Sequence, residues 1–324
     1  MVGVIDVIIS CSNRKKYPVR QGLSLRQVIN RDITKRVGRW LFNLRKLSAP
    51  EYPTEELYAG DHWSIVRAIA SQALNRRIRA RVWICSAGYG LVPYRATLKP
   101  YRATFACGHH DSVSLARSHR ECSVENQRWW DALARSWEGP VPGTPRRLCD
   151  IPRVCGKAPM LVALSSDYLT AIAKDLGQLI SDPYYRTHLH LVSCGSQNPD
   201  ALLSPNLLPC DAGMQSAVGG ARVSLNVRIA AYLLRQLKTG TESHKVLSKL
   251  CNDIKRKPLS QIKRTTVTDR DVRKFIRSEF RKNPGLSRTT LLRILRRKRF
   301  ACEQSRFARL YMATVSSRQR NSYA

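Results

Sequence analysis

VIDVIIS at residues 4–10 runs directly into CSNRKK at residues 11–16. The first stretch is almost continuously apolar, and such a strand is typical of a parallel sheet that is buried on both faces. Three further stretches share this design: VWIC at 82–85 runs into Ser86, MLVAL at 160–164 into Ser165, and LHLVS at 189–193 into Cys194. We therefore predict an α/β fold with a mostly parallel or mixed central sheet, flanked by helices over residues 63–75 and 168–180 among others.

Charge divides the chain into two parts. Its 324 residues are 43% hydrophobic, and 56 Lys and Arg against 23 Asp and Glu give a net charge of +33. Residues 241–324 carry 23 of the basic and 6 of the acidic residues, whereas residues 1–240 carry 33 and 17. Such an excess predicts a polyanionic partner, most often nucleic acid. We predict an α/β body over residues 1–240 and a basic helical nucleic-acid-binding region over residues 241–324.

The apolar stretches and the cysteines indicate the cellular compartment in which we expect the protein. No apolar stretch reaches the roughly 20 residues that span a bilayer, and no basic segment precedes the first one. We expect a soluble cytoplasmic protein without a membrane partner. The ten cysteines are spread along a chain too large to need disulfides, so we expect reduced thiols.

A polar segment rich in His, Trp and Arg interrupts the body at about residues 104–157. We predict an insertion there, with a helix around residues 123–137 followed by a loop rich in Pro and Gly. Its four potential zinc ligands, whose spacing fits no standard zinc module, are Cys107, His109, His119 and Cys122. A solvated basic loop is the favoured alternative, so we expect no cofactor.

The strand ends supply the candidate catalytic residues, because ligands of α/β sheets bind beyond the carboxyl ends of the strands. Cys11 is the candidate nucleophile, since neighbouring cations raise the thiolate fraction, and Cys194 is the second candidate. An inert buried cysteine is an equal alternative for Cys11. Asp61, within LYAGDHW at residues 57–63, could act as a general acid or base, or could only cap a helix.

The stretch SAGYGL at residues 86–91 predicts a glycine-bearing turn after a buried strand. It is not a fingerprint of a dinucleotide or P-loop site, but Tyr89 or Tyr101 could stack on a base. Plain turn chemistry is the alternative, since Ser and Gly are common after strands. The other candidate substrate-binding residues are Ser12, Tyr58, Gly60, Ser86, Gly88 and Ser165.

The basic region predicts a helix, a turn and a second helix. A helix stop at residues 283–285 precedes Ser287, which can cap an amphipathic helix, and the second helix is expected from about Ala301. Three leucines of the first helix should face inward, at positions 291, 292 and 295. The basic residues expected on the outer faces, in contact with nucleic acid, are Arg288, Arg293, Arg296, Arg297, Lys298, Arg306 and Arg309.

Over about residues 4–235, the order of the motifs resembles the YaaA-like superfamily. The motifs are SCSNRKK at 10–16, LYAGDH at 57–62, CSAGYGL at 85–91, KPY at 99–101 and LSSDY at 164–168. With its basic tail and thiols, the chain looks most like the DpdC branch from deazaguanine DNA-modification clusters. That resemblance implies hydrolysis of the nitrile of cyano-deazaguanine in DNA to the amide, after a transglycosylase-type partner has inserted the base.

The resemblance also implies roles for residues. Cys11 would add to the nitrile to give a thioimidate, Asp61 would transfer protons, and the base would be flipped out of double-stranded DNA. Two other functions remain open from the sequence. One is a DNA-binding, DNA-protecting protein of the YaaA type without catalysis, and the other is a base-modifying enzyme that acts on tRNA.

Overall fold

A computed structural model shows two compact units, Met1–Pro258 and Leu259–Ala324. The residues that it describes are 3–71, 77–195, 201–239, 241–257 and 264–321. The boundary between the units lies later than the predicted 240/241. The reason is that helix α11 (His244–Asn252) packs on the core of the first unit through Leu247 and Cys251.

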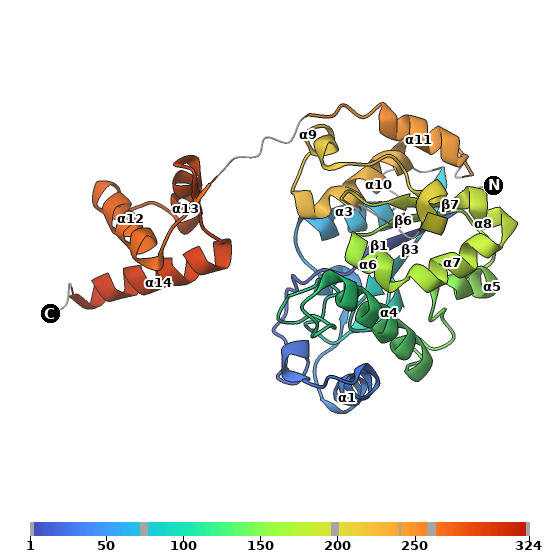
Figure 1. Ribbon diagram of the computed structural model, residues 1–324, viewed down its shortest axis with the longest axis horizontal. Coiled ribbons are helices and arrows are strands. Elements are labelled where there is room, and N and C mark those ends of the chain that lie inside the picture. Colours follow the sequence, from blue (N-terminus) through green and yellow to red (C-terminus); the bar gives the residue numbers. More distant parts are fainter. Residues whose placement is uncertain (1–2, 72–76, 196–200, 240, 258–263, 322–324) are drawn as a thin grey trace. The chain divides into compact units, whose positions relative to one another are not determined.

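A five-stranded mixed sheet forms the centre of the first unit (Figure 1), with the order β4-β3-β1-β6-β7. The strands are β1 (Gly3–Ser10), β3 (Ile78–Ser86), β4 (Gly90–Pro93), β6 (Met160–Ala163) and β7 (Leu189–Val192). Strand β1 pairs in parallel with β3 and β6, and β6 with β7, whereas β4 is antiparallel to β3. The predicted α/β fold is confirmed, and its four apolar stretches correspond to β1, β3, β6 and β7.

Strand β1 is buried on both faces, because helices cover both sides of the sheet. Ile5, Val7, Ile8 and Ile9 are each at most 1% exposed. Helices α3 and α10 lie over one face, and α4, α6 and α7 over the other (Figure 1). Their bounds are α3 Asp61–Ala70, α4 His119–Ser136, α6 Ser166–Ala171, α7 Ala173–Ser181 and α10 Leu225–Gln236.

Two of the predicted helices differ in their bounds. The one expected over residues 168–180 is divided into α6 and α7 by a break at Ile172, and the one expected over 63–75 begins earlier, at Asp61. The remaining elements of this unit include α1 (Ile33–Lys46), β2 (Tyr52–Pro53), α2 (Thr54–Leu57), β5 (Thr97–Leu98), α5 (Ile151–Cys155), α8 (Pro183–His188) and α9 (Gln215–Val218).

The polar segment over residues 104–157 is built into the core. Helix α4 begins after Ser118, whose side chain accepts a hydrogen bond from the Glu121 amide, and it buries Trp129 and Trp130 completely. The Trp130 indole N–H donates to the buried carboxylate of Asp175, at 2.9 Å. The predicted helix is therefore present, and its two tryptophans make it a packing element of the sheet.

The segment also carries a disulfide. Cys107 and Cys122 are bonded, with 5.9 Å between their Cα atoms. The expectation that all the thiols are reduced is wrong at this pair, because the turn before α4 brings two cysteines 15 residues apart into contact. Within the described ranges, no helix combines the length and apolar content needed to cross a membrane.

A buried arginine ties α1 to this segment. Arg36 is 1% exposed, and its guanidinium donates to the carbonyls of Val28 (2.7 Å) and Val113 (2.5 Å). It also donates to the carbonyls of Ser112 (3.1 Å) and Leu25 (3.3 Å). Burial lowers the pKa of Arg36 to about 10, because the charged form loses its hydration.

We expect Arg36→Met to lower the free energy of unfolding by about 3 kcal/mol, since several buried carbonyls lose their donor at once. Urea denaturation followed by tryptophan fluorescence measures the change. The control is Lys35→Met, one residue earlier on the exposed side of α1, which should change stability by less than about 0.5 kcal/mol. Equal stability of the two variants would show that the Arg36 hydrogen bonds do not hold the segment.

The second unit contains α12 (Asp269–Lys282), α13 (Arg288–Arg297) and α14 (Gln304–Asn321). Ser287 caps α13 by accepting from the Thr290 amide, and the three leucines of α13 are buried with Val272 and Phe307. The helix expected from Ala301 starts later, because β9 (Phe300–Ala301) first pairs with β8 (Thr265–Thr266).

Candidate functional site

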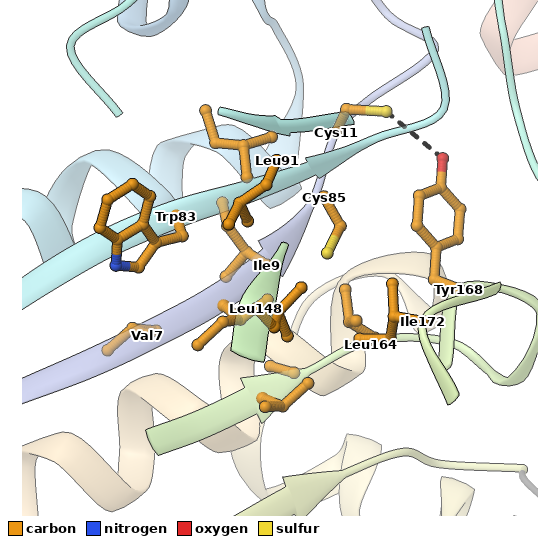
Figure 2. Packing of buried hydrophobic residues seen from close by; sticks show 14 of the residues in the cluster. Val7, Ile9, Cys11, Trp83, Cys85, Leu91, Leu148, Leu164, Tyr168 and Ile172 are labelled. Carbon is orange, nitrogen blue, oxygen red and sulfur yellow. Dashed lines mark hydrogen bonds between the residues drawn. The ribbon is translucent and has the colours of Figure 1, made fainter. Parts of the chain in front are cut away.

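The carboxyl ends of β1 and β3 and the start of α6 bring a thiol and several hydroxyls together. Cys11 follows β1, and its amide donates to the Cys85 carbonyl of β3 at 3.0 Å. Tyr168 from α6 points its hydroxyl at the Cys11 sulfur, 3.3 Å away (Figure 2). Cys11 is 7% exposed and Tyr168 is 7% exposed. The candidate nucleophile is therefore nearly buried, in a cluster of polar side chains that gives it a hydrogen-bonding partner.

A chain of buried hydroxyls lies beside this thiol. The Tyr101 hydroxyl is 2.6 Å from Ser86 Oγ and 2.8 Å from the Tyr58 hydroxyl. Ser86 Oγ already accepts from the amides of Gly88 (3.2 Å) and Tyr89 (3.0 Å). Because both lone pairs of Ser86 Oγ are used, its own proton points to Tyr101, and Tyr101 can donate to Tyr58. Tyr58 is then the last donor of the chain.

Lys15 adds a buried cation to this cluster. Its Nζ lies 4.0 Å from the ring centroid of Tyr101 and 5.3 Å from that of Tyr58, within the range of cation–π attraction. Among the described residues, this Nζ is buried without a hydrogen-bond partner. Burial lowers the pKa of Lys15 to about 8, although the negative charge of a Cys11 thiolate opposes the shift. A buried donor without a partner is unusual in a native structure and is suited to an incoming acceptor.

Cys11 and Lys15 together suit covalent chemistry. Cys11 supplies a sulfur nucleophile, and Lys15, with a pKa of about 8, can both give and take a proton near neutral pH. The sequence places several cations after Cys11 but does not distinguish Lys15 among them. No sequence signal separates it from Lys16, which is exposed; only the fold shows which of the two faces the tyrosines.

Asp61 is held in a different set of contacts. Both of its carboxylate oxygens accept hydrogen bonds from the Arg228 guanidinium of α10, and the Ser224 hydroxyl donates to it as well. The Arg228 hydrogen bonds lower the pKa of Asp61 to about 2. A carboxylate that is ionised and paired in this way is suited to joining α3 to α10, and poorly suited to proton transfer.

His62, the next residue, does reach the strand end. Its Nε2 lies 3.1 Å from the carbonyl oxygen of Ser10, and burial lowers the pKa of His62, so the neutral imidazole is favoured. The neutral ring can donate to this carbonyl, which fixes the last residue of β1 immediately before Cys11. His62 is therefore a positioning residue.

Cys194 lies apart from Cys11, because β6 separates β7 from β1. Its amide donates to Asn226 Oδ1 at 2.8 Å, and Asn226 Nδ2 donates to the Leu164 carbonyl at 2.8 Å. Hydrogen bonding with Cys194 is among the causes that raise the pKa of Cys210, whose sulfur is 3.6 Å from that of Cys251. The two candidate nucleophiles, Cys11 and Cys194, thus lie in separate clusters of side chains.

The turn after β3 is shaped by close packing around Gly88. A Cβ at this position would lie 2.5 Å from Cδ2 of Tyr101, so only glycine lets the tyrosine ring approach. The Trp40 indole N–H fixes the turn by donating to the Gly88 carbonyl at 2.7 Å. Tyr101 is fully buried, and the 6% exposed Tyr89 bonds the Lys99 backbone through its hydroxyl. Both tyrosines are therefore packed side chains, and neither exposes a ring face on which a base could stack as predicted.

The other predicted binding residues are exposed or partly exposed. Ser165 is exposed where β6 leads into α6, and Ser12 Oγ accepts from the Arg14 amide at 3.1 Å. Gly60 precedes α3 with a φ of 96°, a conformation that favours glycine. The structure thus brings Cys11, Tyr58, Ser86 and Tyr101 together and leaves Asp61 and Cys194 in separate networks.

The four predicted zinc ligands cannot bind a zinc ion together, because Cys107 and Cys122 are joined in a disulfide. Three neighbouring side chains, His109, His110 and Asp111, do have ligand atoms within 4.8 Å of one another. Asp111, however, already binds the Arg26 guanidinium with both oxygens, at 2.6 and 2.8 Å. A cation at this place would have to displace Arg26.

The fold and the site define an α/β protein with a buried cluster of a thiol, an ammonium and tyrosine hydroxyls at the carboxyl edge of its sheet. No family model matches the chain, and no curated protein or solved structure matches it significantly. Functional inference therefore rests on the residues of this cluster and on the motifs of the sequence.

We expect Lys15→Met to stabilise the fold by about 2 kcal/mol at pH 7, because methionine fills the space without an unsolvated charge. The folded pKa of about 8 lies below the ordinary 10.5, so the cost of the charge is complete below pH 8. The advantage of the variant should shrink as the pH rises from 8 to 10.5. Chemical denaturation across this range measures it.

The control for this test is Lys16→Met, at the exposed neighbour. It should leave the stability nearly unchanged at every pH. A Lys15→Met variant that is less stable than the wild type at pH 7 would contradict the burial of an uncompensated ammonium.

Asp61→Asn separates a positioning role from proton transfer. If Asp61 only joins α3 to α10, the variant should unfold more easily, by about 1–2 kcal/mol, while the pH dependence of any turnover keeps its shape. The stabilising effect of the wild-type carboxylate should disappear as the pH falls from about 4 towards 2, where Asp61 is protonated. Loss of one limb of the pH–rate profile would assign proton transfer to Asp61.

Proposed function

We propose that the first unit is a thiol-dependent hydrolase that acts on a deazaguanine base in DNA and converts the nitrile of cyano-deazaguanine to the amide. This is the activity that the resemblance to the DpdC branch of the YaaA-like superfamily implies. The observation that supports it most is the Cys11 thiol, hydrogen-bonded to Tyr168 in the same cluster as the buried Lys15 ammonium.

The first step joins Cys11 to the substrate. The thiolate adds to the nitrile carbon, a C–S bond forms, one π bond of the nitrile breaks, and the nitrogen takes a proton from Lys15 to give a thioimidate. The Tyr168 hydroxyl donates to the thiolate beforehand and orients it. Tyr58, at the end of the hydroxyl chain, is placed to donate to the developing negative charge on nitrogen.

Water completes the reaction. Lys15, now neutral, takes a proton from the water as the water oxygen bonds to the thioimidate carbon, and it passes this proton to the nitrogen, which becomes an amine in the tetrahedral intermediate. The C–S bond then breaks and the thiolate of Cys11 leaves, while the hydroxyl gives its proton to Lys15 and its oxygen becomes the amide carbonyl. One water is added overall, and nothing is oxidised or reduced. In this mechanism the proton carrier is Lys15 in place of Asp61.

The proposed substrate is double-stranded DNA with the modified base flipped out of the stack, because a pocket at strand ends does not reach into a duplex. Ser12 and Ser165 would contact this base. A transglycosylase-type partner would supply the cyano-deazaguanine. The basic residues of the second unit would bind the phosphates and supply affinity that does not depend on sequence.

One observation favours a second candidate function. Cys11 is only 7% exposed, as an inert core cysteine would be. A DNA-binding, DNA-protecting protein of the YaaA type without catalysis would share the fold and the basic unit. The same charge would also suit an enzyme that acts on tRNA.

Mass spectrometry of nucleosides distinguishes these functions. DNA that contains cyano-deazaguanine is incubated with the full chain, with and without a chelator, and then digested. We expect the modified nucleoside to gain one water in both samples, and Cys11→Ser to lower the rate by at least about 10³-fold while DNA affinity is kept. Cys194→Ser is the matched control and should retain the activity.

Three outcomes would contradict the proposal. Unchanged nucleosides together with salt-sensitive DNA binding would support the non-catalytic protein. Full activity of Cys11→Ser would remove the thiol from the mechanism. Conversion in tRNA but not in DNA would assign the activity to RNA.

A further inference from the structure

Helix α12 of the second unit carries a stripe of basic side chains that the sequence analysis did not select. The members of this α12 stripe are exposed and consist of Arg270, Arg273, Lys274, Arg277 and Arg281. Their spacings of three, four, seven and eleven residues put them on one face of a helix. The opposite face carries Val272 and Ile276, both fully buried. The core of the unit thus fixes the direction in which the stripe points.

The carboxylates near the stripe are engaged elsewhere. Asp269 pairs with Arg306 at 2.6 Å and with Arg309 at 3.7 Å, and Asp271 closes the N-terminal capping box with Thr268. Glu279 pairs with Lys282 and Lys298, at 3.2 and 3.4 Å. Within the described part of the unit, no stripe residue has a carboxylate oxygen within 4.0 Å of its charged nitrogens. The positive charge of the stripe is therefore not compensated by close ion pairs.

Several of the basic residues predicted to bind nucleic acid also make contacts within the unit. Lys298 and Arg306 take part in the ion pairs with Glu279 and Asp269. Arg296 donates to the Cys302 carbonyl at 3.2 Å, which ties α13 to the segment before α14. Arg288, Arg293 and Arg297 of α13 remain exposed. Among the described residues of the second unit, α12 therefore carries the longest row of basic side chains without a close ion pair. This helix precedes the two helices that the sequence predicted to bind nucleic acid.

We infer that the α12 stripe is a docking surface for the phosphate backbone of duplex DNA. From Arg270 to Arg281 the helix advances about 16 Å, which is long enough to reach more than one phosphate of a duplex backbone. Four of the five stripe residues are arginines, whose planar guanidinium groups match phosphate oxygens in pairs. Complementary charge favours a duplex backbone. The choice of DNA rests on the proposed function, whereas the test below does not.

The test is the salt dependence of binding between the full chain and a random-sequence DNA duplex. In the triple variant Arg273→Gln, Arg277→Gln, Arg281→Gln, we expect the slope of log K against log salt to fall in magnitude by about 3, one phosphate contact for each arginine. The affinity at about 0.1 M salt should fall roughly 100-fold.

Two controls keep the test specific. The triple Arg31→Gln, Lys35→Gln, Lys46→Gln removes the same charge from exposed positions of the first unit, and it should leave the slope within about 1 of the wild type. The triple Arg273→Lys, Arg277→Lys, Arg281→Lys keeps the charge and should keep most of the slope. Circular dichroism confirms that each variant is folded.

Equal losses in the Gln triples of the two units would overturn the inference, because binding would then follow net charge alone. An unchanged slope in the α12 triple would overturn it as well. Binding of anionic phospholipid vesicles lost in the α12 triple, with DNA binding kept, would assign the stripe to a membrane surface. Hydrolysis of the free modified nucleoside, measured in parallel, reports on the proposed function separately, since it does not require the stripe.

Discussion

Burial of strand β1 on both faces is the constraint on which the rest of the first unit depends. Its side chains are closed off by α3 and α10 on one side and by the helices around α4 on the other. Because the strand lies between β3 and β6, its carboxyl end emerges at the centre of the sheet edge. Cys11 and Lys15 follow this end directly and lie in one cluster with hydroxyls from β3 and from the start of α6.

The ammonium beside Cys11 differs from the paired carboxylates of the first unit in its hydrogen-bond partners. Asp61 and Asp175 are each satisfied by an arginine and by further donors, so they contribute to the joining of helices. The Lys15 ammonium, in contrast, is buried against aromatic rings and has no acceptor among the residues that the structure describes. Such a group costs stability. Its position beside a thiol is consistent with a site in which a ligand or a reaction intermediate completes the hydrogen bonds.

In the proposed function, the two units would divide the physical requirements of an enzyme that acts on a large polyanion. A pocket for covalent chemistry must be small and dry, so it does not itself offer a long charged surface. The second unit has a small core of its own, and its exposed cations lie on the faces that this core leaves free. Affinity for phosphates and chemistry on a base can then reside in different parts of one chain.

The sequence by itself determined the α/β class, the four strand ends, the Ser287 cap and the inward leucines of α13, because apolar periodicity and capping are local properties. It also predicted Cys11 as the candidate nucleophile, because of the cations and hydroxyls around it in the sequence. Only the tertiary structure decided the environment of each polar group. Arg228, 167 residues away in sequence, pairs with Asp61. Two of the predicted zinc ligands form a disulfide instead. Lys15 lies against the tyrosine rings, whereas Lys16 is exposed to solvent. The reason is physical: pKa and reactivity depend on burial and on partners that are distant in sequence, and residue type and spacing record neither.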